Sequence, residues 1–218
     1  MGVPTRFVVE YPERCLKLLD RVECWARKER LVGSLALLVA SAAFVIPYER
    51  IKAAHPMHKD EDDGLNEALR KLDKKEKFVN APFWAGEAPG SWRYSRIMNN
   101  ANDTSHWLDE DGKHPVGKDA SNLIGKKTAG TVLRVIRNAL AHGNVVYLSS
   151  DGLEEPGKDL KYLAFLSRYE ETDEDKKRSE TYRLVVASQH DFLAFVRAWA
   201  NWIRSFDESR DTTLFEAA

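Results

Sequence analysis

The chain has 218 residues, which is long enough to bury a substantial core in one large domain or two small ones. Its 43% hydrophobic and 31% charged residues exclude a mainly disordered protein. With 33 basic and 34 acidic residues the formal net charge is −1, so no overall positive field attracts nucleic acid. An RNA-binding surface would have to come from local clusters of Lys and Arg.

Two cysteines, Cys15 and Cys24, lie in one segment with helical periodicity. A helix would separate them by about 13 Å along its axis, which is too far for a disulfide. No Cys/His cluster has zinc-site spacing, and the N-terminus lacks the pattern of a secretory signal. We therefore expect reduced thiols, no metal and cytoplasmic localisation.

Residues 1–79 are predicted to form N-terminal helices. A first amphipathic helix is expected over 11–30, followed by a buried central helix over the apolar segment 31–46, with a kink at Pro47. A membrane span is the alternative for 31–46, but a span needs about twenty apolar residues and this run is shorter. Residues 60–78 are acidic at the start and Lys-rich at the end, which predicts an exposed helix with charges that suit its macrodipole.

Residues 80–118 are predicted to form an irregular connection rich in Trp and Pro. Prolines, glycines and Asn pairs recur throughout this stretch and are typical of turns. Stacking on RNA bases is one role for its aromatic rings, and packing against the core is the other. We expect core packing for four of them, namely Phe83, Trp84, Trp92 and Trp107.

Residues 119–142 are predicted to form a long helix that carries the candidate site. Asp119 or Ser121 is the expected N-cap, and Gly143 suits a left-handed C-terminal cap. A small antiparallel β meander is expected over 145–187, with strands at 145–149, 160–168 and 182–187.

A final helix is predicted over 188–206, beginning at Ser188. Its apolar stripe consists of Phe192, Phe195, Val196, Trp199 and Ile203. The expected fold is mainly α and forms a single domain over 1–218. It is a helical bundle with a small antiparallel β meander inserted between the last two long helices.

A row of polar side chains follows one face of the predicted 119–142 helix. At about 100° per residue these side chains fall near one line: Lys127, Thr131, Arg134, Asn138 and His142. No acidic residue occurs from 126 to 142, and the small residues Gly130, Ala141 and Gly143 flank the row. A solvated amphipathic helix is the simple interpretation. A basic row with small neighbours also suits a ligand that carries phosphate.

The run Arg137-Asn138-Ala139-Leu140-Ala141-His142 resembles the arginine, polar residue, three variable residues, histidine motif of the HEPN superfamily. The resemblance extends over about 121–205, and nothing specific matches in 1–118. A second run, Arg50 to His55, has the same spacing, but apolar Ile51 follows its arginine. The Arg137 run alone combines a polar neighbour, a long predicted helix and a closing glycine.

The resemblance implies a helical bundle and metal-independent cleavage of RNA without a cofactor. The catalytic residues would be Arg137, Asn138 and His142, with Lys127, Thr131 and Arg134 binding RNA phosphates. These residue types suit the chemistry, because RNA supplies its own 2′-hydroxyl nucleophile and a histidine exchanges protons near neutral pH. Arginine offers a fork of donors for charge on the phosphate. The expected products are a 2′,3′-cyclic phosphate and a 5′-hydroxyl.

One motif supplies one histidine, whereas this cleavage uses both an acid and a base. Similar family members place two motifs across a twofold axis, so the resemblance implies a homodimer with a composite active site. It also implies a toxin or defence setting, in which a neutralising partner protein is expected. The alternative function is a non-catalytic HEPN-fold module that binds RNA or protein.

Overall fold

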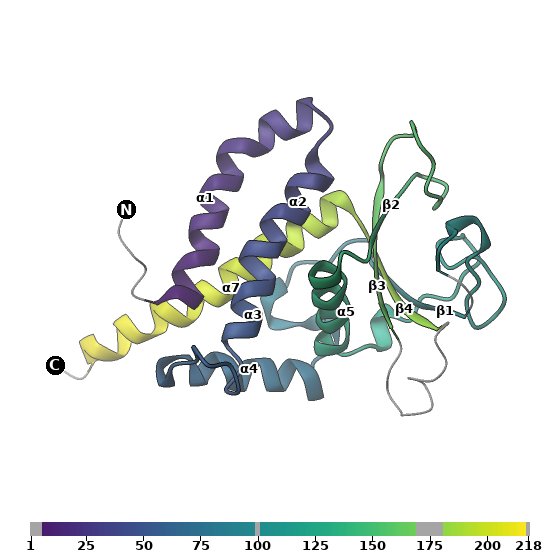
Figure 1. Cartoon of the computed structure of the whole chain (residues 1–218). Coiled ribbons are helices and arrows are strands. Elements are labelled where there is room, and N and C mark those ends of the chain that lie inside the picture. The colour runs from purple at the N-terminus through teal and green to yellow at the C-terminus, as the bar shows by residue number, and fades with distance from the viewer. Residues whose placement is uncertain (1–5, 99–100, 169–180, 217–218) are drawn as a thin grey trace.

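Figure 1 shows the computed structural model, which describes residues 6–98, 101–168 and 181–216, with 207–216 as backbone only. The helices are α1 (Phe7–Lys28), α2 (Val32–Ala40), α3 (Ile46–Arg50), α4 (Asp63–Lys74), α5 (Ala129–His142) and α7 (Gln189–Glu216). The strands are β1 (Arg93–Ile97), β2 (Val145–Leu148), β3 (Tyr162–Arg168) and β4 (Tyr182–Ser188). Helix predominates in this part of the chain, which confirms the predicted mainly α class.

The helices α1, α2 and α7 pack on one another, and α5 lies between this layer and the sheet (Figure 1). The start of α7 agrees with the prediction, because the Asp191 N–H donates to the Ser188 hydroxyl at 3.0 Å and caps the first turn. The predicted apolar stripe of α7 is fully buried, which confirms it as the core face: Phe192, Phe195, Val196, Trp199 and Ile203.

The sheet has the strand order β1-β4-β3-β2, and all neighbours are antiparallel. The three predicted strands are present. A fourth, β1, pairs Arg93 with Val186 and Ile97 with Tyr182. The prediction that 80–118 contains no strand, and that all strands lie after the motif helix, is therefore wrong. The run from Trp92 to Ser95 alternates between aromatic and polar side chains, but Arg96 breaks this period and turn residues flank the strand, so the signal for it was weak.

Each face of the sheet is buried by a different part of the chain. Leu163, Phe165 and Val185 pack against the helices, while Leu166 and Leu184 pack against the segment that follows β1. The aromatic side chains of 80–118 lie in these two cores, which confirms the packing interpretation: Phe83, Trp84, Trp92 and Trp107 are all 4% exposed or less.

The apolar segment after α1 forms one continuous helical run with a π-helical stretch at Ser41–Val45, between α2 and α3. Pro47 has no N–H to donate to the preceding turn, and the wider π turn just before it accommodates this loss. One side of the run is buried through Ala40 and Phe44, whereas Leu38 on the other side is 71% exposed. The predicted central helix is thus buried on one face only.

By length and composition, Val32–Arg50 is apolar enough to cross a membrane. Half of the most apolar stretch of this segment is buried inside the fold. Buried core helices of soluble proteins can have the same length and composition.

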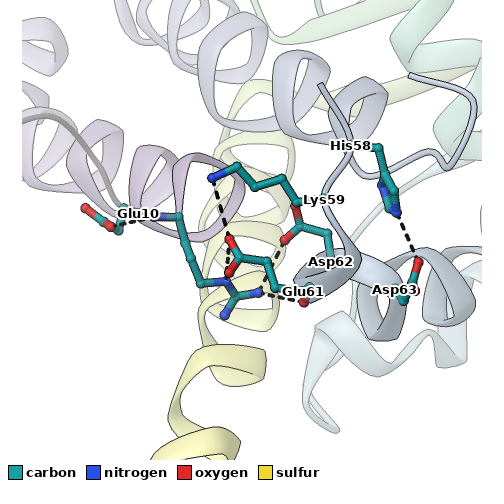
Figure 2. A network of polar contacts seen from close by, with 7 residues as sticks. Glu10, His58, Lys59, Glu61, Asp62 and Asp63 are labelled. Carbon is teal, nitrogen blue, oxygen red and sulfur yellow. Dashed lines mark hydrogen bonds and ion pairs between the residues drawn. The ribbon is translucent and has the colours of Figure 1, made fainter. Parts of the chain in front are cut away.

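Polar contacts fix the start of α1 against the turn that leads into α4 (Figure 2). The guanidinium of Arg6 donates to the Asp62 carboxylate and to the Glu61 carbonyl oxygen, each at 3.3 Å. In the same turn, His58 Nε2 lies 3.0 Å from Asp63 Oδ1, and this hydrogen bond raises the pKa of His58. The helix α4, expected over 60–78, covers only Asp63–Lys74, and its apolar side chains are buried on the bundle.

Candidate active site

The helix α5 begins later than predicted and ends where predicted. Thr128 is the N-cap, since its hydroxyl oxygen accepts from the Thr131 N–H at 3.2 Å, and neither Asp119 nor Ser121 caps it. At the other end Gly143 adopts φ +71°, a left-handed conformation that favours glycine. The apolar face of α5 is buried: Val132, Leu133, Val135, Ile136 and Ala139. Packing of this face therefore fixes the rotation of the helix about its axis.

Arg137 is held by two hydrogen bonds on the partly exposed side of α5. Its Nε donates to Glu49 Oε1 of α3 at 2.6 Å, and its NH1 donates to Asn138 Oδ1 at 2.7 Å. The Arg137 side chain is 29% exposed. Its pKa is raised by the hydrogen bond with Glu49, although partial burial acts in the opposite direction. Within the described residues the remaining guanidinium N–H groups make no hydrogen bond, which leaves them available for an anionic ligand.

Glu49 connects Arg137 with a second cation. Lys52 donates from Nζ to the same oxygen, Glu49 Oε1, at 2.8 Å. Partial burial acts to raise the pKa of Glu49, but the hydrogen bonds from Arg137 and Lys52 outweigh it, so this pKa is lowered. The carboxylate is therefore charged at neutral pH and holds the guanidinium in one orientation.

Tyr48 lies beside this ion pair, 5% exposed. Burial and the nearby charge of Asp73 raise its pKa to about 12, and the charges of Arg134 and Arg137 oppose this rise. The phenol is therefore neutral across the physiological pH range. The ammonium group of Lys52 lies 4.7 Å from the centre of its ring, a cation–π distance.

Asn138 links Arg137 to the sheet. Its Oδ1 accepts from Arg137, and its Nδ2 donates to the Ser167 hydroxyl on β3 at 3.1 Å. Ser167 is 5% exposed, so this contact is well protected from water. The amide is thus fixed at both ends, and it can orient Arg137 through its oxygen.

His142 is the last residue of α5, and its side chain is exposed. Within the described residues its imidazole makes no hydrogen bond or ion pair, and it therefore contacts neither Arg137 nor Asn138 in this way. The structure thus joins Arg137 and Asn138 by a hydrogen bond. His142 follows them by one helical turn and stands at the exposed end of the helix. Exposed Ala141, Gly143 and Asn144 flank it and leave the ring open to a ligand.

The three predicted phosphate-binding residues have partners inside the chain. Arg134 NH2 lies 3.3 Å from Asp73 Oδ1 of α4, and its side chain stays 54% exposed. The Thr131 hydroxyl lies 2.8 Å from the hydroxyl of Thr128. Lys127 precedes the helix, outside the predicted row, and its Nζ lies 4.8 Å from the centre of the Tyr94 ring.

The polar row of α5 contains no acidic residue of its own, but carboxylates from other elements contact Arg134 in the row and Arg137 beside it. Asp73 and Glu49 come from α4 and α3, so they are far away in the sequence. Gly130 also has an internal role, because a Cβ there would lie 2.5 Å from the Cα of Asp73. The small residue at this position allows α4 to pack closely on α5.

The second run with motif spacing is structural. The guanidinium of Arg50 lies 4.2 Å from the centre of the Phe7 ring. His55 Nδ1 accepts from the Met57 N–H at 3.1 Å. Both residues thus hold the connection around α3, and they lack a polar neighbour equivalent to Asn138.

Three residues around Arg137 could not be recognised from the sequence: Glu49, Tyr48 and Ser167. None of them shares a local motif with Arg137, and Glu49 is 88 residues away. The described residues contain no group of three or more His, Cys, Asp or Glu side chains that could hold a metal ion.

The model of the HEPN pEK499 p136 family matches residues 1–210. The chain belongs to this HEPN family. The match includes the N-terminal half, where the sequence motif gave no resemblance, and membership indicates a nuclease or RNA-related function at the level of the superfamily. No curated protein and no solved structure matched the chain.

Proposed function

We propose that this HEPN protein is a metal-independent endoribonuclease, with Arg137, Asn138 and His142 as its catalytic residues. The 2′-hydroxyl of RNA attacks the adjacent phosphorus and loses its proton to a base, while the bond from phosphorus to the 5′-oxygen breaks. An acid protonates the departing 5′-oxygen. The products are a 2′,3′-cyclic phosphate and a 5′-hydroxyl, and the proton balance is closed without a metal or a redox step.

One observation carries the proposal: an exposed histidine, which has no partner among the described residues, ends the same helix that carries Arg137. An imidazole that is free of internal hydrogen bonds can accept or donate the proton of a bound hydroxyl. Arg137 uses Nε and one NH1 hydrogen within the protein, and its other donors suit two phosphate oxygens. Arg134, exposed beside it, adds positive charge along α5.

The proposal includes a homodimer, because acid and base require two histidines. Exposed apolar side chains support a second copy near this site: Leu38 is 71% and Ile46 40% exposed on α2 and α3. The π-helical stretch between these helices packs on α5. Exposed apolar area is typical of an interface between subunits. A toxin or defence role in the cytoplasm, with a neutralising partner protein, belongs to the same proposal.

The alternative is a non-catalytic binding module. It is favoured by the carboxylates of Glu49 and Asp73, which neutralise Arg137 and Arg134 inside the chain. Such a module would bind RNA or protein without turnover.

Cleavage of labelled RNA in the presence of EDTA separates the two functions. We expect wild-type protein to cut, and His142→Ala to lose about 10²-fold or more, which is typical of a general acid–base residue. Arg137→Lys should lose most activity, because an ammonium lacks the guanidinium fork. The matched control is the pair Arg50→Lys and His55→Ala, which should cut normally if folded. A folded protein that cuts no RNA, or an active His142→Ala variant, would establish the binding module instead.

A further inference from the structure

A cavity of about 600 Å³ lies apart from the motif, at the edge of the sheet where β1 and β3 begin on either side of β4. Its volume falls within the range of sites for small molecules. The side chains that matter most for its chemistry are Ser91, Arg93, Lys118, Asn122, Ser150 and Lys161.

This cavity is separate from the proposed active site. Tyr162 and Val186, which also line it, belong to the sheet face that turns away from α5. Ser167, the contact of Asn138 on β3, lies six positions after Lys161, which corresponds to about 20 Å of extended strand. In Figure 1 the segment that follows β1 lies across the sheet from α5.

Three cations from separate segments line the cavity, namely Arg93, Lys118 and Lys161. None of the described lining residues is acidic, and within that part of the chain no ion pair involves these three side chains. This differs from α5, where Arg134 and Arg137 each contact a carboxylate. The cavity therefore concentrates positive charge in a chain with a net charge of −1.

The cationic groups sit on a fixed frame. Arg93 NH1 donates to the Gly117 carbonyl oxygen at 3.0 Å, and Lys161 Nζ lies 5.3 Å from the centre of the Tyr162 ring. Asn122 ties the two walls together, since its Oδ1 accepts from the Tyr94 N–H at 3.2 Å and its Nδ2 donates to the Trp92 carbonyl oxygen at 2.9 Å. A frame that is already ordered lowers the entropic cost of binding.

A carboxylate lies close to the cavity, and it has its own partners. Asp191 Oδ2 accepts from the Ser91 N–H at 3.1 Å and from the Ser188 hydroxyl at 2.7 Å. These bonds belong to the cap of α7, and among the described residues Asp191 makes no ion pair with Arg93 or Lys161.

We propose that this cavity binds a small phosphate ester of nucleotide size. Guanidinium and ammonium groups in one pocket recognise phosphate oxygens through charge-assisted hydrogen bonds. The hydroxyls of Ser91 and Ser150 supply further donors at its mouth. The site does not depend on the proposed ribonuclease activity, because it shares no residue with Arg137, Asn138 or His142.

Isothermal titration calorimetry on the full chain tests the site with three probes: adenosine diphosphate, inorganic pyrophosphate and a short RNA with 2′-methoxy groups that resists cleavage. We expect adenosine diphosphate to bind with one-to-one stoichiometry and to bind more weakly as salt increases. Arg93→Gln and Lys161→Gln should each weaken binding by about tenfold, the usual effect of losing one charged hydrogen bond. Lys28→Gln, which removes an exposed charge on α1, and Arg137→Ala should bind as the wild type does.

The arms identify the source of the phosphate. Equal affinity for pyrophosphate would show that the cavity recognises phosphate groups alone, and it would overturn the ester of nucleotide size. Binding of the RNA alone would overturn the small-ligand proposal. So would absence of binding at millimolar adenosine diphosphate, or unchanged affinity in both Arg93→Gln and Lys161→Gln. Lys161 is exposed, so its variant is expected to fold even if Arg93→Gln loosens the contact with Gly117.

Discussion

Arg137 and Glu49 lie 88 residues apart in the sequence, yet Arg137 Nε donates to Glu49 Oε1 at 2.6 Å. This ion pair joins α5 to α3, and within the described residues Asn138 is the one other group that accepts a hydrogen bond from the guanidinium. The carboxylate thus acts as a positioning group for an arginine that would otherwise sample many rotamers. Its effect on activity and its effect on stability can be measured separately.

The first prediction concerns activity. Glu49→Ala should lower RNA cleavage by roughly tenfold, since a charged hydrogen bond that orients Arg137 is lost. Glu49→Gln should retain more activity, because its amide oxygen still accepts from Arg137 Nε. Steady-state kinetics should place the loss in kcat more than in KM if orientation is the cause. Glu23→Ala is the matched control, since Glu23 also contacts two cations, Arg27 and Arg197, away from α5. An equal loss in the control would indicate general destabilisation instead.

The second prediction concerns acid stability. The lowered pKa of Glu49 means that its ion pair stabilises the fold fully above the unfolded-state pKa, about 4.5. This contribution is lost as the pH falls through the lower folded-state pKa. The difference in unfolding free energy between wild type and Glu49→Gln should therefore be constant above about pH 5 and shrink below about pH 4. Urea unfolding at a series of pH values measures it, and a difference that shrinks only above pH 6 would contradict the assignment.

Local signals predicted much of this fold, and non-local contacts explain what they missed. The end of α5 at His142 and the buried stripe of α7 follow from a glycine cap and from periodicity. The start of α5 could not be predicted in this way, because the capping residue is Thr128 and not the equally suitable Asp119 or Ser121. The neutralising role of Glu49 could not be predicted either, since only the packing of α3 on the bundle brings it to α5.

The third prediction concerns the packing of α4 on α5. Gly130→Ala would place a Cβ against Asp73, 2.5 Å from its Cα, so the two helices must separate. We expect a loss of about 1–3 kcal/mol of unfolding free energy, as in other overpacked sites. Gly64→Ala in α4 meets nothing within 4 Å, and it should stabilise by up to about 1 kcal/mol. Thermal and urea unfolding measure both variants. A neutral Gly130→Ala would show that α4 is not held closely at Asp73.

The fourth prediction tests the homodimer through an exposed apolar side chain of α2. Leu38 is 71% exposed, so Leu38→Glu should fold normally, while a buried charge would destabilise an interface there. We expect sedimentation at micromolar concentration to show a dimer for wild type and a monomer for Leu38→Glu. RNA cleavage should also decrease in Leu38→Glu, because a monomer supplies a single His142. Leu18→Glu, at 67% exposure on α1, is the matched control and should remain dimeric and active. A monomeric wild type that still cuts RNA would show that one motif suffices, and the composite site would then be wrong.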